Sequence, residues 1–394
     1  MPPTPPELVI GTTPAAHFGA GSIKRLPELI SAAGGQSALI VTDGALAATD
    51  VIAAVTDLLD RAGIAPTVFA GVHPNPTTAD LAAGAAEAAG LLTARPVVVA
   101  VGGGSPIDAA KGIALATVNP QRGRELDYRS DFRTPALPLL AVPTTAGTGA
   151  ETNAFGVVTD EGSHRKFYVG HATTMPAAAI LDPELTLGLP AGATAATGMD
   201  ALTHAIESYL SVRSNPWSAG IALQVVRMVS EFLPRAYADG HDREARAQML
   251  LAAHMAGIAM ASTGLGACHA IGHALGGRFD VAHGVALSLV LPSVLTFSSP
   301  VCRSQLADLA LALGAGGRGA GETAATAEEN AVAAISAVAA LAESVGMKHR
   351  LADFGITTED FEVIAADALD DEVIANAPVK PTAPDIKSML AAVA

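Results

Sequence analysis

The sequence is poor in cysteine and has no recognisable export signal. Its 394 residues include only two cysteines, Cys268 and Cys302, and neither belongs to a Cys-x-x-Cys pair. A disulfide framework or a thiolate zinc site is therefore not expected. The first residues contain neither a basic start nor an apolar run, so we expect no secretory signal and a cytoplasmic protein.

Charged residues, and basic ones in particular, are also scarce. Lys and Arg number 23 against 38 Asp and Glu, which gives a formal net charge of −15. Such an acidic surface repels phosphate, so we expect no binding to nucleic acid or to an anionic membrane surface. Apolar stretches are broken by Gly, Pro or charge before the ~20 residues that a membrane helix needs. Hydrophobic residues make up 50%, which is ample for a large core.

The first half of the chain alternates short apolar runs with Ala-rich helical patterns. Uninterrupted apolar runs are typical of strands that are covered on both faces, and this alternation predicts an open, doubly wound parallel sheet. The strands are expected at 37–42, 65–70, 96–101, 136–142 and 178–181, and the first helices at 45–62 and 78–93.

After about Leu189 the strand-like runs disappear and long helical patterns follow. A glycine-rich stretch at 314–321 is expected to form a mobile loop. We therefore predict an α/β dinucleotide-binding domain over residues 1–189 and an all-helical domain over 190–394. The helical patterns of the second domain lie at 194–212, 217–238, 243–262, 285–297 and 323–345.

A glycine-rich loop follows the expected strand at 96–101 and opens a helix. Glycines let the backbone approach an anion closely, and a helix N-terminus offers free N–H groups and the positive end of a dipole. This pattern predicts a pyrophosphate site, although it is not the Gly-x-Gly-x-x-Gly fingerprint. The alternative is a tight turn without a ligand. The loop consists of Gly102, Gly103, Gly104 and Ser105, and Pro106 suits the first helical turn.

Two further features are expected at the same carboxyl edge of the sheet as the glycine-rich loop. The turn at 143–149 also follows a strand, and its hydroxyls and glycines can line this edge. The alternative is an ordinary Thr/Gly turn. Asp43 ends another expected strand. Its carboxylate can accept a hydrogen bond from a ribose 2′-hydroxyl and repel a 2′-phosphate, which favours NAD over NADP. The alternative is an N-cap or Asx-turn role.

One carboxylate and several histidines recur at helical spacing in the second half. Asp200 and His204 are four residues apart, so they share a helix face, and His269 and His273 repeat this spacing before His283. A carboxylate with imidazoles suits Fe(II) or Zn(II) and can keep a position open for substrate. Each histidine alone would be read as a core side chain. The spacing leaves open whether His269 or His273 is the ligand.

Together these motifs resemble the iron-containing (group III) alcohol dehydrogenase family. The matching stretches are 102–115, 143–151, 195–211 and 264–292, which span nearly the whole chain in order. The resemblance implies a Rossmann-like N-terminal domain, a helical domain that binds metal and substrate, and an active site in the cleft between them. It also implies a homodimer.

The resemblance also implies roles for individual residues. It puts the metal, Fe(II) with Zn, Ni or Mn as alternatives, on Asp200, His204, His269 and His283. His273 then falls beside the nicotinamide or the substrate, where it can relay a proton. The residues that fall where the family contacts the dinucleotide are Asp43, Asn75, Gly102, Gly103, Gly104, Ser105, Pro106, Thr144, Thr145, Thr148, Lys166 and Leu185.

The function implied is reversible, metal-dependent hydride transfer between a small alcohol and its aldehyde or ketone, with NAD(H). A metal-independent reductase resembling maleylacetate reductase is one alternative, but that branch need not keep the aspartate ligand. A lyase resembling dehydroquinate synthase is another. Its anionic substrate needs clustered basic side chains, and no lysine lies between Lys166 and Lys348. The third alternative is a non-catalytic nucleotide-binding protein.

Overall fold

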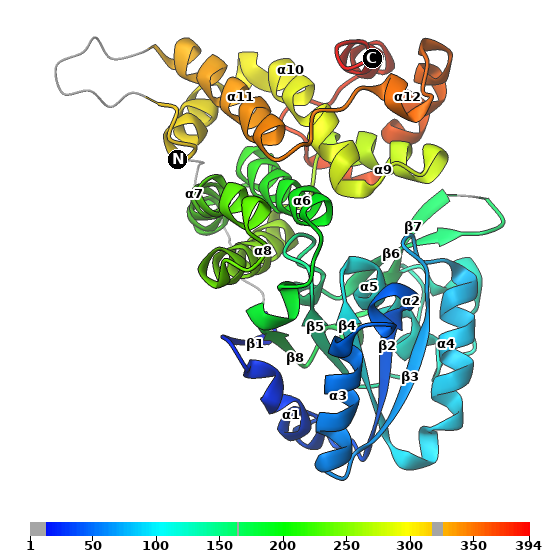
Figure 1. The fold of residues 1–394 in the computed structure, drawn as a ribbon. Helices are drawn as coiled ribbons and strands as arrows, with labels where there is room; N and C mark the ends of the chain where they lie inside the picture. Colours follow the sequence, from blue (N-terminus) through cyan, green and yellow to red (C-terminus); the bar gives the residue numbers. More distant parts are fainter. Residues whose placement is uncertain (1–12, 164, 317–325) are drawn as a thin grey trace. The chain divides into compact units, whose positions relative to one another are not determined.

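A computed structural model describes residues 13–163, 165–316 and 326–394 (Figure 1). The chain divides into two compact units, one that ends at Gly188 and one that begins at Leu189. We call them the N-terminal unit and the C-terminal unit. All strands of the described residues belong to the N-terminal unit, and the described part of the C-terminal unit is helical. The predicted fold class, an α/β dinucleotide-binding domain followed by an all-helical domain, is confirmed.

A six-stranded parallel sheet lies at the centre of the N-terminal unit. Every neighbouring pair in this sheet is parallel, as predicted. A separate antiparallel hairpin, β6 (Phe155–Asp160) and β7 (Arg165–Gly170), adds to the strands expected from the sequence. The sheet has the spatial order β1-β8-β5-β4-β2-β3, with β1 (Ala15–Phe18), β2 (Ser37–Asp43), β3 (Ala65–Val72), β4 (Pro96–Gly102), β5 (Leu139–Pro143) and β8 (Ala178–Leu181).

Helices cover both faces of the sheet, which explains the uninterrupted apolar runs. Successive side chains of a strand point to opposite faces. Val98 of β4 packs in one core with residues of α4 (Thr78–Gly90) and α5 (Gly104–Ala116). Val97 and Val99 pack in the other core, with residues of α1 (Leu26–Ala32) and α3 (Asp50–Arg61).

Two expected helices are shorter than the sequence indicated. The prediction of a single helix at 45–62 is wrong, because the chain forms two helices there, α2 (Gly44–Ala47) and α3. Thr49 separates them: it is extended, and its hydroxyl accepts a hydrogen bond from Val51 N as the N-cap of α3. The helix at 78–93 ends at Gly90, and a 3-10 turn at Leu92–Ala94 follows.

The C-terminal unit is built from eight α-helices within its described residues. Helix α10 is much longer than the expected 285–297. It continues through Pro292 and Pro300 and changes direction at Cys302, where the backbone is not helical. Most of the glycine-rich loop expected at 314–321 lies outside the described residues. The helices are α6 (Ala191–Leu210), α7 (Pro216–Ala238), α8 (Arg243–Thr263), α9 (Ala267–Phe279), α10 (His283–Ala312), α11 (Ala327–Ser344), α12 (Phe361–Asp370) and α13 (Ala383–Ala391).

Among the individual helices of the described residues, only α10 is long and apolar enough to cross a membrane. However, 56% of its most apolar 18-residue window is buried inside the protein. It packs against α6, α9 and α11. A core helix passes the same test, and these contacts are those of a core helix.

Lys111 of α5 holds the loop that follows β5. Its side chain is fully buried, and its Nζ donates hydrogen bonds to the carbonyl oxygens of Ala150 and Phe155 and to Asn153 Oδ1. Three acceptors match the three N–H groups of an ammonium. Burial lowers the pKa of Lys111 to about 8 from its ordinary 10.5, against the opposing effect of Asp108, which lies 3.8 Å away.

Replacing this lysine with methionine tests its role in stability. Lys111→Met leaves the carbonyls of Ala150 and Phe155 without their donor, and each buried unpaired group costs roughly 1–3 kcal/mol. We expect a lower free energy of unfolding in urea. The folded-state pKa lies below the unfolded value of 10.5, so the buried charge opposes folding below pH 8.

This opposition disappears as the pH rises from about 8 to 10.5. The difference in unfolding free energy between wild type and Lys111→Met should therefore grow in favour of wild type across that window. A difference that is constant or shrinks over the same range would contradict the assignment.

Candidate active site

Most of the residues expected to bind the dinucleotide follow the carboxyl ends of parallel strands. Because the strands are parallel, these ends lie at one edge of the sheet, where open α/β sheets bind their ligands. Lys166 differs, since it lies on the hairpin strand β7. The positions are Asp43 after β2, Asn75 after β3, Gly102 to Pro106 after β4, Thr144 to Thr148 after β5, and Leu185 in a 3-10 turn (Pro183–Thr186) after β8.

The glycine loop and the threonine turn lie directly against each other. Thr144 N donates to Gly102 O at 2.9 Å. A Cβ atom added at Gly104 would lie 2.7 Å from Thr148 Cγ2, so a larger residue would force the two segments apart. Ser105 Oγ donates to Pro74 O, which brings the segment that contains Asn75 to the same loop.

The N-terminus of α5 offers an uncapped set of N–H groups to an anion. Its N-cap is Gly103, which makes no side-chain capping hydrogen bond, and the first turn contains no acidic residue. These N–H groups lack partners within the helix and carry the positive end of its dipole. The loop therefore has the chemistry that a pyrophosphate requires.

Asp43 caps the short helix α2. Its Oδ1 accepts hydrogen bonds from Ala45 N and Leu46 N, both at 2.9 Å. The N-cap alternative is thus confirmed. The carboxylate still lies at the carboxyl end of β2, beside β4 in the sheet, so its contact with a ribose stays a prediction.

Lys166 and Leu185 occupy different surroundings. Lys166 pairs with Thr159 in the hairpin, and Thr159 N donates to Pro76 O at 2.8 Å, which ties the hairpin to the Asn75 segment. Leu185 packs against the core formed with α1 and α3.

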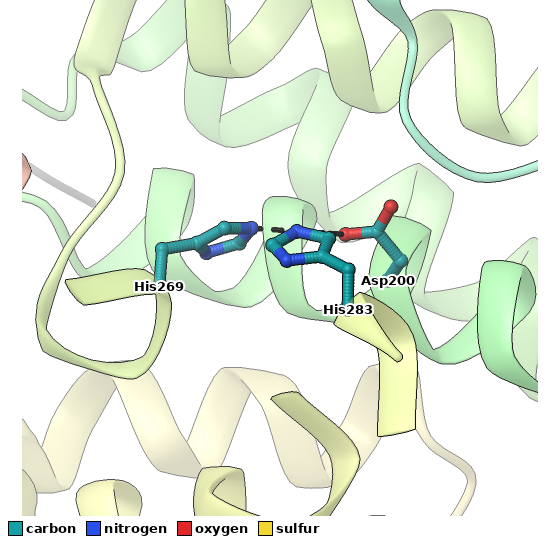
Figure 2. A group of neighbouring side chains, drawn as sticks. All are labelled: Asp200, His269 and His283. Carbon is teal, nitrogen blue, oxygen red and sulfur yellow. Dashed lines mark ion pairs between the residues drawn. The ribbon is translucent and has the colours of Figure 1, made fainter. Parts of the chain in front are cut away.

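Three of the four expected metal ligands converge on one point in the C-terminal unit. Asp200 comes from α6, His269 from α9 and His283 from the start of α10. One ligand atom of each lies within 4.8 Å of the others. Figure 2 shows the two imidazoles turned toward the carboxylate of Asp200. The structure therefore favours His269 over His273 as the ligand, as the resemblance implied.

The spacing of these atoms fits a tetrahedral cation site. Asp200 Oδ1 lies 3.3 Å from His204 Nε2, 3.7 Å from His269 Nε2 and 3.6 Å from His283 Nε2. Bonds of ~2.1 Å at tetrahedral angles place neighbouring ligand atoms ~3.4 Å apart. His204 is outside the group of three, but its ring stacks on His269 with centroids 4.7 Å apart.

Two buried polar atoms in this cluster are left without a hydrogen-bond partner among the described residues, namely Asp200 Oδ1 and His269 Nε2. Their side chains are only 3% and 1% exposed. A buried polar atom without a partner is costly, and a divalent cation would satisfy both atoms at once. The donor set therefore fits a transition metal.

The charges of the cluster act on each other. Burial alone would raise the pKa of Asp200, but His204 and His283 lower it below its ordinary value. Burial alone would lower the pKa of His269, but Glu207 and Asp200 raise it to about 9. The site thus favours positive charge at its centre.

Close helix packing brings His283 to Asp200. His283 is the first residue of α10, and the next residue, Gly284, contacts α6. A Cβ atom added at Gly284 would lie 2.0 Å from Ala196 O, a backbone atom of α6. No side chain fits at this contact.

His273, expected to act on the proton, lies one turn after His269 on α9. Its ring stacks on His283 with centroids 5.4 Å apart, and its Nδ1 lies 2.6 Å from Asp371 Oδ2. Sequence reasoning missed two carboxylates here: Asp371, and Glu207, whose Oε2 lies 2.6 Å from His269 Nδ1. Glu207 could have been found, since it follows Asp200 by seven residues on the same helix face.

Comparisons with known proteins cover both units. Residues 13–183 match the family described as iron-containing alcohol dehydrogenase, and residues 194–394 match the C-terminal part of the Fe-containing alcohol dehydrogenase family. A probable alcohol dehydrogenase of Salmonella typhimurium, EutG, is 37% identical over 96% of this chain and 93% of its own length. The NAD-dependent methanol dehydrogenase of Bacillus methanolicus is 35% identical over 96% of this chain and 97% of its own length. The structure of an alcohol dehydrogenase from Oenococcus oeni superposes with a TM-score of 0.90 at 34% identity. The match covers 97% of this chain and 99% of that structure's chain.

Adding one methyl group at the glycine loop tests the dinucleotide site. Gly104→Ala must displace Thr148, and overpacking of this kind costs roughly 1–3 kcal/mol. We expect NADH to bind about tenfold more weakly in a fluorescence titration. Gly90→Ala is the matched control, because an added Cβ there meets nothing within 4 Å. Equal affinities for the two variants would contradict the assignment.

Replacing Gly284, the residue after His283, with alanine tests the metal site. Gly284→Ala must push α10 away from α6, which moves His283 from Asp200. We expect metal retention during dialysis against a chelator to fall about tenfold or more, measured by elemental analysis. Gly220→Ala in α7 faces open space and should keep the metal while stabilising its helix by up to about 1 kcal/mol. Equal retention in both variants would disprove this arrangement.

Proposed function

The chain belongs to the iron-containing alcohol dehydrogenase family and is an NAD(H)-dependent alcohol/aldehyde oxidoreductase. We propose that Asp200 and the three imidazoles beside it form the catalytic metal site. The observation that carries this proposal is the position of Asp200 Oδ1, 3.3–3.7 Å from three imidazole nitrogens. In this proposal Fe(II) is the metal, held by Asp200, His204, His269 and His283. Zn, Ni and Mn are alternatives for the same donors.

The N-terminal unit holds the coenzyme in this proposal. The pyrophosphate takes the free N–H groups at the start of α5, and the hydroxyls of Thr144, Thr145 and Thr148 line the adjoining turn. Asn75 and Lys166 belong to the segments tied to this loop, and Leu185 follows the neighbouring strand β8. The Asp43 carboxylate at the end of β2 disfavours a 2′-phosphate, so NAD is preferred over NADP.

When bound, the metal supplies Lewis-acid stabilisation of negative charge on the substrate oxygen, and NAD supplies the hydride acceptor. The protein's own part is orientation and proton handling. His273 Nδ1 donates to Asp371 Oδ2, which holds one proton on that nitrogen and leaves Nε2 to exchange the other. The His273 side chain is 10% exposed, so a proton that it takes up can pass on to water.

The proposed substrates are small primary alcohols and their aldehydes. The names of the relatives, which include a methanol dehydrogenase and a lactaldehyde reductase, support this class. The coordinating groups and the relay histidine can act on any hydroxyl that reaches them. A cytoplasmic location and a homodimer stay predictions.

The test is a coupled assay of a panel of alcohols and aldehydes. Protein purified without oxygen would be stripped of metal and reloaded with Fe(II), Zn(II), Ni(II) or Mn(II), and NADH absorbance would be followed. We expect turnover with NAD that is faster than with NADP and that requires added metal. Turnover in the fully stripped protein, or none with any metal, would disprove the proposal.

The variant His273→Ala separates proton handling from metal binding. We expect kcat to fall about 10²-fold, the scale of general acid–base catalysis, while metal content and NADH affinity stay at wild-type values. Unchanged kcat would remove His273 from the mechanism. A parallel loss of metal would instead make it a ligand.

A further inference from the structure

We propose that Glu207 is the positioning residue of the metal site: its buried carboxylate orients His269 and selects the tautomer in which His269 binds metal. This inference rests on the metal site proposed above. Glu207 itself does not belong to the group of converging ligand atoms.

The geometry around Glu207 is that of a buried clamp. Its Oε2 lies 2.6 Å from His269 Nδ1 and also accepts a hydrogen bond from Gly266 N at 3.0 Å. Its Oε1 accepts from Cys268 N at 2.7 Å. The Glu207 side chain is 7% exposed, so these three donors replace water around the carboxylate.

The first consequence concerns the start of α9. Its N-cap, Gly266, has no side chain to accept the first N–H groups of the helix, and the Glu207 carboxylate takes that role from α6. A Cβ atom added at Gly266 would lie 2.9 Å from Glu207 Oε1. Glycine at this position therefore leaves room for the carboxylate.

The second consequence concerns the tautomer of His269. A carboxylate can only accept, so Nδ1 carries a hydrogen atom, and in the neutral ring Nε2 has the lone pair that can bind a metal. Nε2 is the atom that lies 3.7 Å from Asp200 Oδ1 and has no hydrogen-bond partner among the described residues. The lone pair thus points to where the metal is proposed to bind, and the carboxylate makes it a stronger donor.

One helix therefore determines most of the site. Asp200, His204 and Glu207 follow one another on the same face of α6, at the spacing i, i+4 and i+7. The first two are proposed ligands, and the third sets the orientation of a ligand on another helix. His273 also has a carboxylate at Nδ1, but that carboxylate, Asp371, comes from the segment after α12.

The substitution Glu207→Gln keeps the volume and removes the charge. Either orientation of the glutamine amide puts its NH2 group against a backbone N–H group, that of Cys268 or that of Gly266, so the variant loses the charge and at least one hydrogen bond of the clamp. The hydrogen atom on His269 Nδ1 then has no charged acceptor, and the Nε2 lone pair becomes a weaker donor to the metal. We expect Zn²⁺ to bind 10–100-fold more weakly.

The experiment measures Zn²⁺ affinity by competition with a chromophoric chelator. The variants are Glu207→Gln, Glu207→Asp and the control Glu231→Gln, which removes a charge from the exposed side of α7. We expect wild-type affinity for Glu231→Gln, the weakest binding for Glu207→Gln, and intermediate binding for Glu207→Asp, which keeps the charge. NADH affinity should stay unchanged in all three. The imidazole ¹⁵N shift of His269 Nδ1 should report a bound hydrogen atom in the Zn²⁺-loaded wild type. That shift should change in Glu207→Gln and not in Glu231→Gln, because only Glu207→Gln removes the charged acceptor of this hydrogen atom.

The outcomes separate the two proposals. If the wild type binds no Zn²⁺, the metal site itself fails and this inference falls with it. If the wild type binds Zn²⁺ and Glu207→Gln binds it equally with an unchanged His269 Nδ1 shift, only the role of Glu207 is overturned. If Glu207→Gln does not fold, Glu207→Asp decides: affinity equal to that of Glu231→Gln overturns the proposal, and weaker binding supports it.

Discussion

A buried carboxylate among imidazoles constrains the whole C-terminal unit. Asp200 Oδ1 lies within 3.7 Å of three imidazole nitrogens, yet it accepts no hydrogen bond from the described residues. Such a group is stable in a protein interior only with a positive partner. The packing of α6, α9 and α10 brings the imidazoles to this carboxylate, and glycine at position 284 allows the close approach of α10 to α6.

The sequence predicted the fold where a single local signal sufficed. Strand β4 was visible because both of its faces are buried, so all of its residues are apolar. Other elements depend on competing signals. Thr49 divides a continuous apolar pattern by capping α3, and α10 continues past two prolines to Ala312 because α6 and α11 pack around it. Hydrophobic periodicity carries neither kind of information.

The residues of the candidate site also fall into two groups, those that local spacing predicts and those that depend on distant partners. The spacing of Asp200 and His204 on one helix could be read directly. The choice between His269 and His273 could not, because both occupy the same face of α9. Their difference comes from partners far away in the chain: Glu207, 62 residues before His269, and Asp371, 98 residues after His273. Only the folded chain brings these carboxylates to them.

All four proposed ligands and Glu207 lie in the C-terminal unit, on α6, α9 and α10. In the proposed site, metal binding therefore requires no side chain of the N-terminal unit, where the coenzyme is proposed to bind.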